Sequence, residues 1–313
     1  MPHPRSRRLS GVAAAAVLVA GLGACAQAGD PSAEAAGTTR AIATAFGDVT
    51  VPEAPKRVIA LSEAALDTAL ALGVKPVGTT ARRGGDAPPA YLTEATGIPV
   101  VATVSEPNLE EIVKAEPDLI LGATGLAKAQ YDKLAAVAPT VVPEPGLLNW
   151  EKQLGTYAAA LGRKPALDEK LAGLRARAAA VKAEQKVGAT AVVLRWMPNG
   201  AIVMNAGLMP GAALEDAGTS ALPISAGVGD KPHTDPLSLE NLSRVDADHI
   251  FIGTFDEEGQ NALAAARKQP AFARLKAAEA GAVTAVDGGV WTSSSGPIAW
   301  DRVLDDIEKA YAG

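Results

Sequence analysis

Hydrophobic positions along most of the chain fall into two patterns that alternate. Short continuous apolar runs, such as Val58–Leu61 and Leu119–Gly122, are typical of strands buried in a parallel sheet. Longer stretches, such as Glu63–Leu72, carry apolar residues three and four positions apart, as amphipathic helices do, and Gly73 follows where a helix commonly ends. Because strand and helix patterns alternate from Pro55 onward, the sequence predicts an α/β fold.

The same two patterns predict elements along the whole chain. Expected strands span residues 42–51 (two short strands around a turn), 58–61, 76–80, 100–104, 119–122, 140–142, 190–196, 201–205, 250–254 and 282–286. Expected helices span residues 63–72, 109–115, 127–136, 150–161, 166–186, 211–217, 239–243, 262–267, 272–280 and 297–311. Residues 227–236 and 288–293 are expected to form loops, the second being too polar for a core.

The longest helical pattern, Ala166–Lys186, lies near the middle of the chain. Pro165 precedes it where a first-turn proline belongs, and Gly188 lies just beyond its end. At 1.5 Å per residue such a helix is on the order of 30 Å long, about the width of a small domain. We therefore expect it to carry the chain from one lobe to another.

Sequences on the two sides of this helix resemble each other. Leu109–Ile112 followed by Asp118–Leu121 matches Leu239–Leu242 followed by Asp248–Phe251, at a constant offset of 130 residues. Strand-then-helix patterns also recur by chance in α/β chains, so matches this short leave both explanations open. The favoured architecture is two similar lobes with mainly parallel sheets, joined by one long helix, with a ligand cleft between them.

This architecture divides the chain into five parts. They are a signal peptide (residues 1–24), a flexible tether (25–40), an N-terminal lobe (41–148), connecting helices (149–188) and a C-terminal lobe (189–313) that ends in a closing helix (297–311).

The first 24 residues have the features of a secretory signal. A basic start precedes an apolar run, Gly11–Leu22, that is too short to span a bilayer comfortably. Leu22-Gly23-Ala24-Cys25 then resembles a bacterial lipobox, in which the cysteine receives lipid, and Cys25 is the only cysteine of the chain. The alternative is an ordinary secretory signal with an incidental cysteine. Ser6-Arg7-Arg8 resembles the start of a twin-arginine (Tat) signal, but the apolar residues that should follow are poorly matched, and the sequence does not decide between Sec and Tat export.

Composition excludes some classes of protein. The 313 residues are 48% hydrophobic, which argues against disorder, and suffice for two sizeable cores. The net charge is −6, and it falls to about −9 without the signal, which holds three arginines and no acid. Nucleic acid is not an expected partner, because phosphate binding needs an electropositive face.

The sequence offers few residues for a metal site or for a hydrolase active site. With Cys25 assigned to lipid, only His233 and His249 remain in the mature chain, so a zinc site of histidine and cysteine is not expected. Residues 293–295 are serines that could pair with His233 in a hydrolase, but no nucleophile motif surrounds them. The sequence therefore predicts a binding protein without a catalytic step.

Four segments in order along the chain carry a family resemblance. They are Val51–Leu61, Ala71–Gly78, Asn108–Glu110 with Glu116–Ile120, and Leu237–Leu242. With the lipobox, they resemble the substrate-binding lipoproteins of iron-siderophore ABC importers, a class that also includes haem and cobalamin binders. The resemblance implies two α/β lobes, a rigid connecting helix and a shallow cleft that closes only slightly on its ligand.

The resemblance also implies roles for particular residues. Glu110 and Glu240, related by the offset of 130, match acids that dock the two lobes to permease arginines. An acid in the first turn of a helix also complements the helix dipole, and the two roles are compatible. Arg82, Arg83, Arg195 and Trp196 occupy the cleft positions, because they end or follow predicted strands. Second-rank candidates for ligand contact are Tyr91, Trp150, Met209 and Trp291.

The sequence thus predicts a monomeric, lipid-anchored receptor on the outer face of the cytoplasmic membrane. It would bind a ferric siderophore and deliver it to an ABC permease, with iron held by the siderophore and no cofactor of its own. A haem receptor is the alternative, with Tyr91 or His233 as axial ligand. Cobalamin binding and an extracytoplasmic hydrolase are weaker alternatives.

Overall fold

The computed structural model describes residues 38–103, 106–184 and 188–312. The predicted signal peptide, Cys25 and nearly all of the predicted tether lie outside these residues. Strand β1 (Thr39–Thr44) begins one residue before the predicted end of the tether, because Arg40 is fixed by Nε–H and Nη2–H bonds to the carbonyls of Ala159 and Ala160, at 2.8 and 3.0 Å. Within the described part of the chain, no helix is long and apolar enough to cross a membrane.

The N-terminal lobe is built on a five-stranded parallel sheet of strand order β5-β4-β3-β6-β7. Its strands are β3 (Val58–Ala60), β4 (Gly78–Thr80), β5 (Val100–Ala102), β6 (Leu119–Leu121) and β7 (Thr140–Val141). The hairpin of β1 and β2 (Gly47–Pro52) forms a separate antiparallel sheet, as its sequence predicts. Helices of this lobe are α1 (Glu63–Ala71), α2 (Leu109–Lys114), α3 (Lys128–Ala135) and α4 (Trp150–Ala160), with a short 3-10 helix η1 (Thr93–Ala95).

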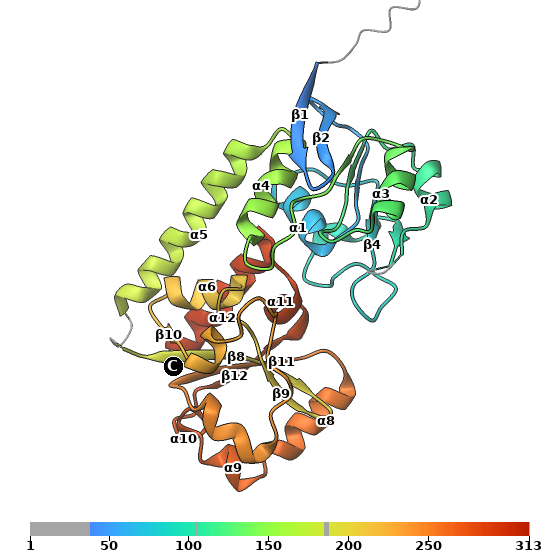
Figure 1. The fold of residues 1–313 in the computed structure, drawn as a ribbon. Coiled ribbons are helices and arrows are strands. Elements are labelled where there is room, and N and C mark those ends of the chain that lie inside the picture. The colour runs from blue at the N-terminus through green and yellow to red at the C-terminus, as the bar shows by residue number, and fades with distance from the viewer. Residues whose placement is uncertain (1–37, 104–105, 185–187, 313) are drawn as a thin grey trace, which may run out of the picture. The chain divides into compact units, whose positions relative to one another are not determined.

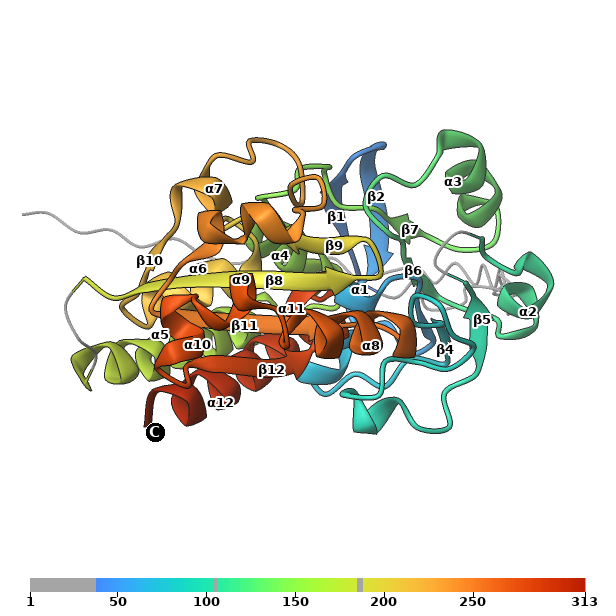
Figure 2. The same ribbon diagram turned by 90° about the horizontal axis from the view of Figure 1, so that it is seen from below.

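The C-terminal lobe repeats this design around a sheet of order β10-β8-β11-β12, with β9 paired antiparallel to β8. Figure 2 shows β8, β11 and β12 side by side. The strands are β8 (Thr190–Met197), β9 (Gly200–Val203), β10 (Ser220–Ala221), β11 (His249–Thr254) and β12 (Val283–Asp287). The helices are α6 (Met209–Asp216), α7 (Pro223–Ala226), η2 (Leu239–Val245), α8 (Glu257–Ala266), α9 (Pro270–Ala273), α10 (Lys276–Glu279), α11 (Gly288–Ser293) and α12 (Pro297–Ala312).

The internal repeat is visible in matching contacts at the start of each sheet. In the N-terminal lobe, the Asp118 carboxylate accepts the backbone N–H of Arg57 at 2.9 Å, just before β3. In the C-terminal lobe, the Asp248 carboxylate accepts the backbone N–H of Thr190 at 2.9 Å, at the start of β8. Asp118 and Asp248 are the aspartates related by the offset of 130, so the two-lobe fold predicted from the sequence is confirmed.

The long helix α5 (Lys164–Glu184) lies within two residues of its predicted start and packs against α4, α6 and α12 (Figure 1). Its buried face carries the leucines of the predicted pattern, Leu167, Leu171 and Leu174. Arg177 of α5 pairs with three acids of α12, Asp301, Asp305 and Glu308, at 2.6 to 2.8 Å. Connecting and closing helices are therefore held to each other by both apolar packing and charge.

Several predicted boundaries in the C-terminal lobe were wrong. Residues 239–243, expected as a helix, begin the 3-10 helix η2, and the helix expected over 272–280 is interrupted between α9 and α10. Helices α7 and α11 were missed. Residues 288–293 read as a polar loop, but the Asp287 side chain caps α11 by accepting the backbone N–H of Val290 at 3.0 Å.

Candidate ligand cleft

A cavity of about 640 Å³ is lined by residues of both lobes. Most of these residues follow the carboxyl ends of strands, where ligands bind in parallel α/β sheets. From the N-terminal lobe they are Arg83, Thr124, Gly125, Pro145, Gly146, Leu147, Trp150 and Gln153. From the C-terminal lobe they are Arg195, Met204, Leu208, Met209, Pro210, Pro232, His233 and residues 291–295. We call this cavity the cleft.

Arg195 on β8 is held by the helix that lies against the neighbouring strand. Its Nε–H donates to the Thr292 hydroxyl at 2.9 Å, and a second guanidinium N–H donates to the Thr292 carbonyl. Helix α11 reaches this position because Gly253 and Gly288 let it approach β11: a Cβ on Gly253 would lie 2.7 Å from the Gly288 Cα. The guanidinium also lies over the Phe255 ring, at 4.4 Å from its centroid. Arg195 is thus pre-positioned before any ligand binds.

Arg83 and Arg195, which are predicted ligand contacts from different lobes, both line the cleft. Burial, with a smaller effect from the positive charge of Arg83, lowers the pKa of Arg195 to about 10. Arg195 therefore remains charged at neutral pH. Within the described residues neither arginine has a carboxylate within 4.0 Å, and no acid lines the cleft. The cleft therefore holds a positive charge that a bound anion would neutralise.

Trp150 and Met209 form part of an apolar wall of the cleft. Both are almost fully buried, and Trp150 packs edge-on against Trp300 at 5.3 Å between ring centroids. Leu147, Leu208 and the prolines of the cleft extend this surface. The wall offers dispersion contacts to the apolar flank of a ligand, while the arginines face its charged part.

Trp196 does not line the cleft, so its prediction as a ligand contact was wrong. Its side chain is 3% exposed and packs edge-on against Phe272 in the core on the other face of the sheet. Successive residues of a strand point to opposite faces. Since Arg195 points into the cleft, the adjacent Trp196 must point away from it.

Trp291 lines the cleft, but mainly as a core residue. It is 1% exposed, stacks on Phe251 at 4.5 Å between centroids, and donates its indole N–H to Asp306 at 2.9 Å. Its indole N–H already has a partner. Trp291 therefore leaves little surface for a ligand.

Tyr91 and Arg82 lie outside the residues that line the cleft. The Tyr91 hydroxyl donates to the Asp67 carboxylate at 3.0 Å, and burial raises the pKa of Tyr91 well above its ordinary value. A tyrosine fixed in this way does not serve as a haem ligand in the cleft. Arg82 is exposed in a tight turn in which its backbone N–H donates to the Ala87 carbonyl at 2.8 Å. Of the two adjacent arginines, only Arg83 therefore lines the cleft.

His233 and Ser293 line the same cleft, but no hydrogen bond joins them within the described chain. The His233 ring nitrogen Nδ1 lies 2.8 Å from the Thr234 carbonyl, and Ser293 lies 3.5 Å from the Arg195 guanidinium. No group of three or more metal-ligating side chains is found in the part of the chain that the structure describes.

Several cleft residues were not predicted. Thr124 and Gly125 follow β6, Gly146 and Leu147 follow β7, and Gln153 lies on α4, where its side chain donates to the Gly146 carbonyl at 2.8 Å. The rule that selected the arginines, position just after a strand, applies equally to the two loops. Their cleft-lining residues are uncharged and not aromatic, so nothing in the sequence marks them as ligand contacts.

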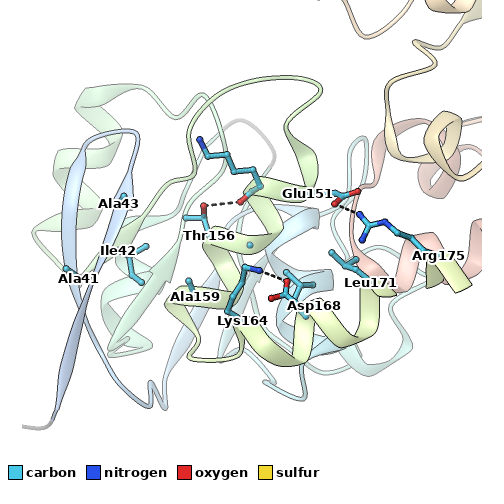
Figure 3. A pocket seen from close by; sticks show the side chains of 13 residues that line it. Ala41, Ile42, Ala43, Glu151, Thr156, Ala159, Lys164, Asp168, Leu171 and Arg175 are labelled. Carbon is cyan, nitrogen blue, oxygen red and sulfur yellow. Dashed lines mark hydrogen bonds and ion pairs between the residues drawn. The ribbon is translucent and has the colours of Figure 1, made fainter. Parts of the chain in front are cut away.

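A second hollow of about 610 Å³ lies between β1, α4 and α5 (Figure 3). Four of its five charged side chains form ion pairs, Arg175 with Glu151 and Lys164 with Asp168, and the fifth is Lys152. Side chains whose charges are already paired within the protein attract a charged ligand only weakly. The cleft, with its unneutralised arginines, is the better candidate site.

Glu110 and Glu240, the predicted docking acids, are both exposed. Glu110 lies in the first turn of α2 and pairs with Lys114 at 3.0 Å, whereas Glu240 lies in the first turn of η2. Their accessibility suits contact with a partner, and their docking role stays a prediction.

A cleft between two similar α/β lobes that one long helix joins defines a two-lobed substrate-binding protein. The chain belongs to the periplasmic binding protein family, whose model matches residues 58–288.

Relatives of known description agree with this family. The chain is 30% identical over 285 residues to the probable siderophore-binding lipoprotein YfiY of Bacillus subtilis, covering 87% of this chain and 88% of that protein. It is 28% identical over 280 residues to the Fe(3+)-citrate-binding protein YfmC of the same organism, covering 87% and 85%. Among solved structures, Staphylococcus aureus SirA complexed with staphyloferrin B matches with a TM-score of 0.75 and 25% identity, covering 87% of this chain and 98% of SirA. The predicted siderophore class of substrate-binding protein is confirmed.

Proposed function

We propose that this chain is a lipid-anchored receptor that binds a negatively charged ferric siderophore and delivers it to an ABC permease for iron import. Iron reaches the protein already enclosed by the siderophore. The chain acts by binding and release, with no catalytic step and no resident cofactor, and works as a monomer.

The observation that carries this proposal is the pair of unneutralised arginines in the cleft. Guanidinium groups bind carboxylate, catecholate and hydroxamate oxygens through paired N–H donors, and such bonds are among the stronger ones in proteins. Arg195 is already oriented by Thr292, so little side-chain entropy is lost when a ligand binds. An anion between Arg83 and Arg195 would also relieve the repulsion between them.

The relatives support the same ligand class. YfmC is described as binding ferric citrate, and SirA was solved with staphyloferrin B. Of the two candidate haem ligands, Tyr91 is committed to Asp67 and lies outside the cleft lining, so a haem receptor would rely on His233 alone. The apolar wall around Trp150 and Met209 would cover the part of the siderophore that faces away from the charges.

Membrane attachment and docking complete the proposal. Lipid on Cys25 would hold the folded body at the outer face of the cytoplasmic membrane, and this segment is outside the described residues. YfiY, the relative of similar length, is described as a lipoprotein. Glu110 and Glu240, one on each lobe, would face equivalent arginines on a two-fold symmetric permease.

Quenching of tryptophan fluorescence tests the ligand class and the cleft together. The chain is titrated with ferric citrate, a ferric trihydroxamate, a ferric tricatecholate and haemin. We expect saturable quenching by a negatively charged ferric chelate, weakened at least tenfold (about 1.4 kcal/mol) by Arg195→Ala. Arg82→Ala, a neighbouring arginine outside the cleft lining, should change the affinity less than twofold. Quenching by haemin alone would contradict the proposal.

A further inference from the structure

A smaller cavity of about 260 Å³ opens from the cleft into the N-terminal lobe. The two cavities share five lining residues, Arg83, Thr124, Gln153, Ser293 and Ser295, so they are continuous. The smaller one is also lined by residues at the carboxyl ends of three strands, Leu61, Thr80 and Ala123. A single water needs only about 15 Å³, so the space accommodates an arm of several atoms.

Glu63 is the one acid that lines either cavity within the described residues. It begins α1 and is half-buried, and burial raises its pKa above the ordinary value. Its carboxylate accepts only long hydrogen bonds, from the Arg83 backbone N–H at 3.3 Å and the Ser294 hydroxyl at 3.4 Å. In the described part of the chain, no cationic side chain lies within 4.0 Å of it. Its capacity to accept hydrogen bonds is therefore largely unused.

The hydroxyl groups around Glu63 are largely engaged within the protein. The Tyr157 hydroxyl donates its proton to the Gly122 carbonyl at 2.8 Å, and that of Thr80 donates to the Ala81 carbonyl at 3.2 Å. The Ser62 hydroxyl lies 3.3 Å from the Tyr157 oxygen and can donate to it. The Ser62 oxygen already accepts the Ala65 backbone N–H at 3.1 Å, and the Tyr157 oxygen faces the Ser62 hydroxyl. The acceptor capacity that remains is therefore centred on the Glu63 carboxylate, which suits a ligand group with N–H donors.

We propose that this cavity is a subsite for a protonated amine on an arm of the ligand, with Glu63 as its counter-ion. The inference rests on the proposed siderophore function and adds a specificity element to it. Arg195 lines only the cleft, Arg83 lines both cavities and opposes by its positive charge the rise that burial causes in the pKa of Glu63, and Glu63 lines only the smaller cavity. A chelate with an anionic iron centre and one aminoalkyl arm matches this order of charges.

The test uses matched pairs of ferric chelates. Citrate-type, trihydroxamate and tricatecholate chelators are each prepared with one aminoalkyl arm, and again with the amine acetylated, which removes its charge. Dissociation constants are measured for the full chain in mild detergent, for Glu63→Gln, and for Glu257→Gln as control. Glu257 is a first-turn acid of α8 that lines neither cavity, so it reports effects on a helix terminus alone.

We expect acetylation to weaken binding to the wild-type chain about tenfold or more for at least one chelate, the range for a hydrogen bond between charged groups. In Glu63→Gln this preference should shrink below threefold, and in Glu257→Gln it should persist. A steric penalty from the acetyl group would persist in Glu63→Gln, so an unchanged preference there overturns the subsite. Equal binding of amine and acetyl forms to the wild type overturns the subsite and leaves the siderophore function standing. Failure of every chelate to bind overturns both.

Discussion

Asp67 of α1 is a buried carboxylate that caps a helix of the other lobe. Its oxygens accept the backbone N–H groups of Ile298 at 2.8 Å and Ala299 at 2.9 Å, and the Tyr91 hydroxyl donates to it at 3.0 Å. Ile298 and Ala299 lie in the first turn of α12, whose N–H groups have no partner within the helix. Asp67 therefore ties the first helix of the N-terminal lobe to the closing helix.

Burial raises the pKa of Asp67 to about 7, although the three hydrogen bonds oppose this shift. Its ordinary pKa is 3.8, so between about pH 4 and pH 7 the folded state holds a proton that the unfolded state has released. The stability that the folded state gains by holding this proton on Asp67 is therefore greatest below pH 4 and is lost as pH rises to 7. One proton changes this free energy by at most about 1.4 kcal/mol per pH unit, so the loss is on the order of 4 kcal/mol.

Asp67→Asn keeps an acceptor oxygen for α12 and removes the titration. The free energy of unfolding of the variant, minus that of the wild type, should rise by several kcal/mol between pH 4 and pH 7 and level off above pH 8. Asp67→Ala leaves two backbone N–H groups and the Tyr91 hydroxyl without their partner, so it should be about 3 kcal/mol less stable than Asp67→Asn.

Urea denaturation followed by circular dichroism from pH 4 to pH 8 measures these differences. Asp132→Asn, at an exposed position of α3, is the control and should show a much smaller pH-dependent difference. A difference between Asp67→Asn and wild type that stays flat across this range would refute the buried titration. An Asp67→Ala variant as stable as Asp67→Asn would refute the capping role.

Three further predictions concern stability and transport. Gly296→Ala should lower the free energy of unfolding by about 3 kcal/mol, because the added Cβ would overlap the buried Asp67 carboxylate. Gly173→Ala, whose Cβ would have no atom within 4 Å, should instead stabilise α5 by about 0.5–1 kcal/mol. Equal urea midpoints for the two variants would contradict this contrast. Trp196→Leu should lower the free energy of unfolding by about 2–3 kcal/mol and change the affinity for a ferric chelate less than twofold, because Trp196 is a core residue. A tenfold loss of affinity would show that Trp196 contacts the ligand. The double variant Glu110→Ala and Glu240→Ala should bind the chelate normally yet lose most ⁵⁵Fe uptake in cells, and unchanged uptake would rule out docking through these acids.

Sequence pattern alone determined most of the scaffold. Continuous apolar runs located the central strands of both sheets, because strands buried on both faces leave no polar positions. The period of α5 and of α12 located the connecting and closing helices within two residues of their starts, since each buries one apolar face along several turns. The offset of 130 identified the two lobes, and a position at or just beyond the end of a predicted strand identified Arg195 and Arg83 as cleft residues.

Alternation along a strand could have excluded Trp196 from the cleft, since its neighbour Arg195 was already placed there. Helix α11 is harder to predict from the sequence. Its six residues are too few to show a helical period, and its cap and its packing against Gly253 depend on the neighbouring strand.

Only the tertiary structure decided how the charges are arranged. Asp67 reaches Ile298, and Glu63 reaches Ser294, across 231 residues of sequence in each case. No local pattern records contacts of that range, because they arise from the packing of one lobe against the other. The same packing sets Arg83 against Arg195 and leaves Glu63 facing a cavity. The sequence therefore determined the class of protein, and the tertiary contacts decided which charges are buried, which are paired and which remain for a ligand.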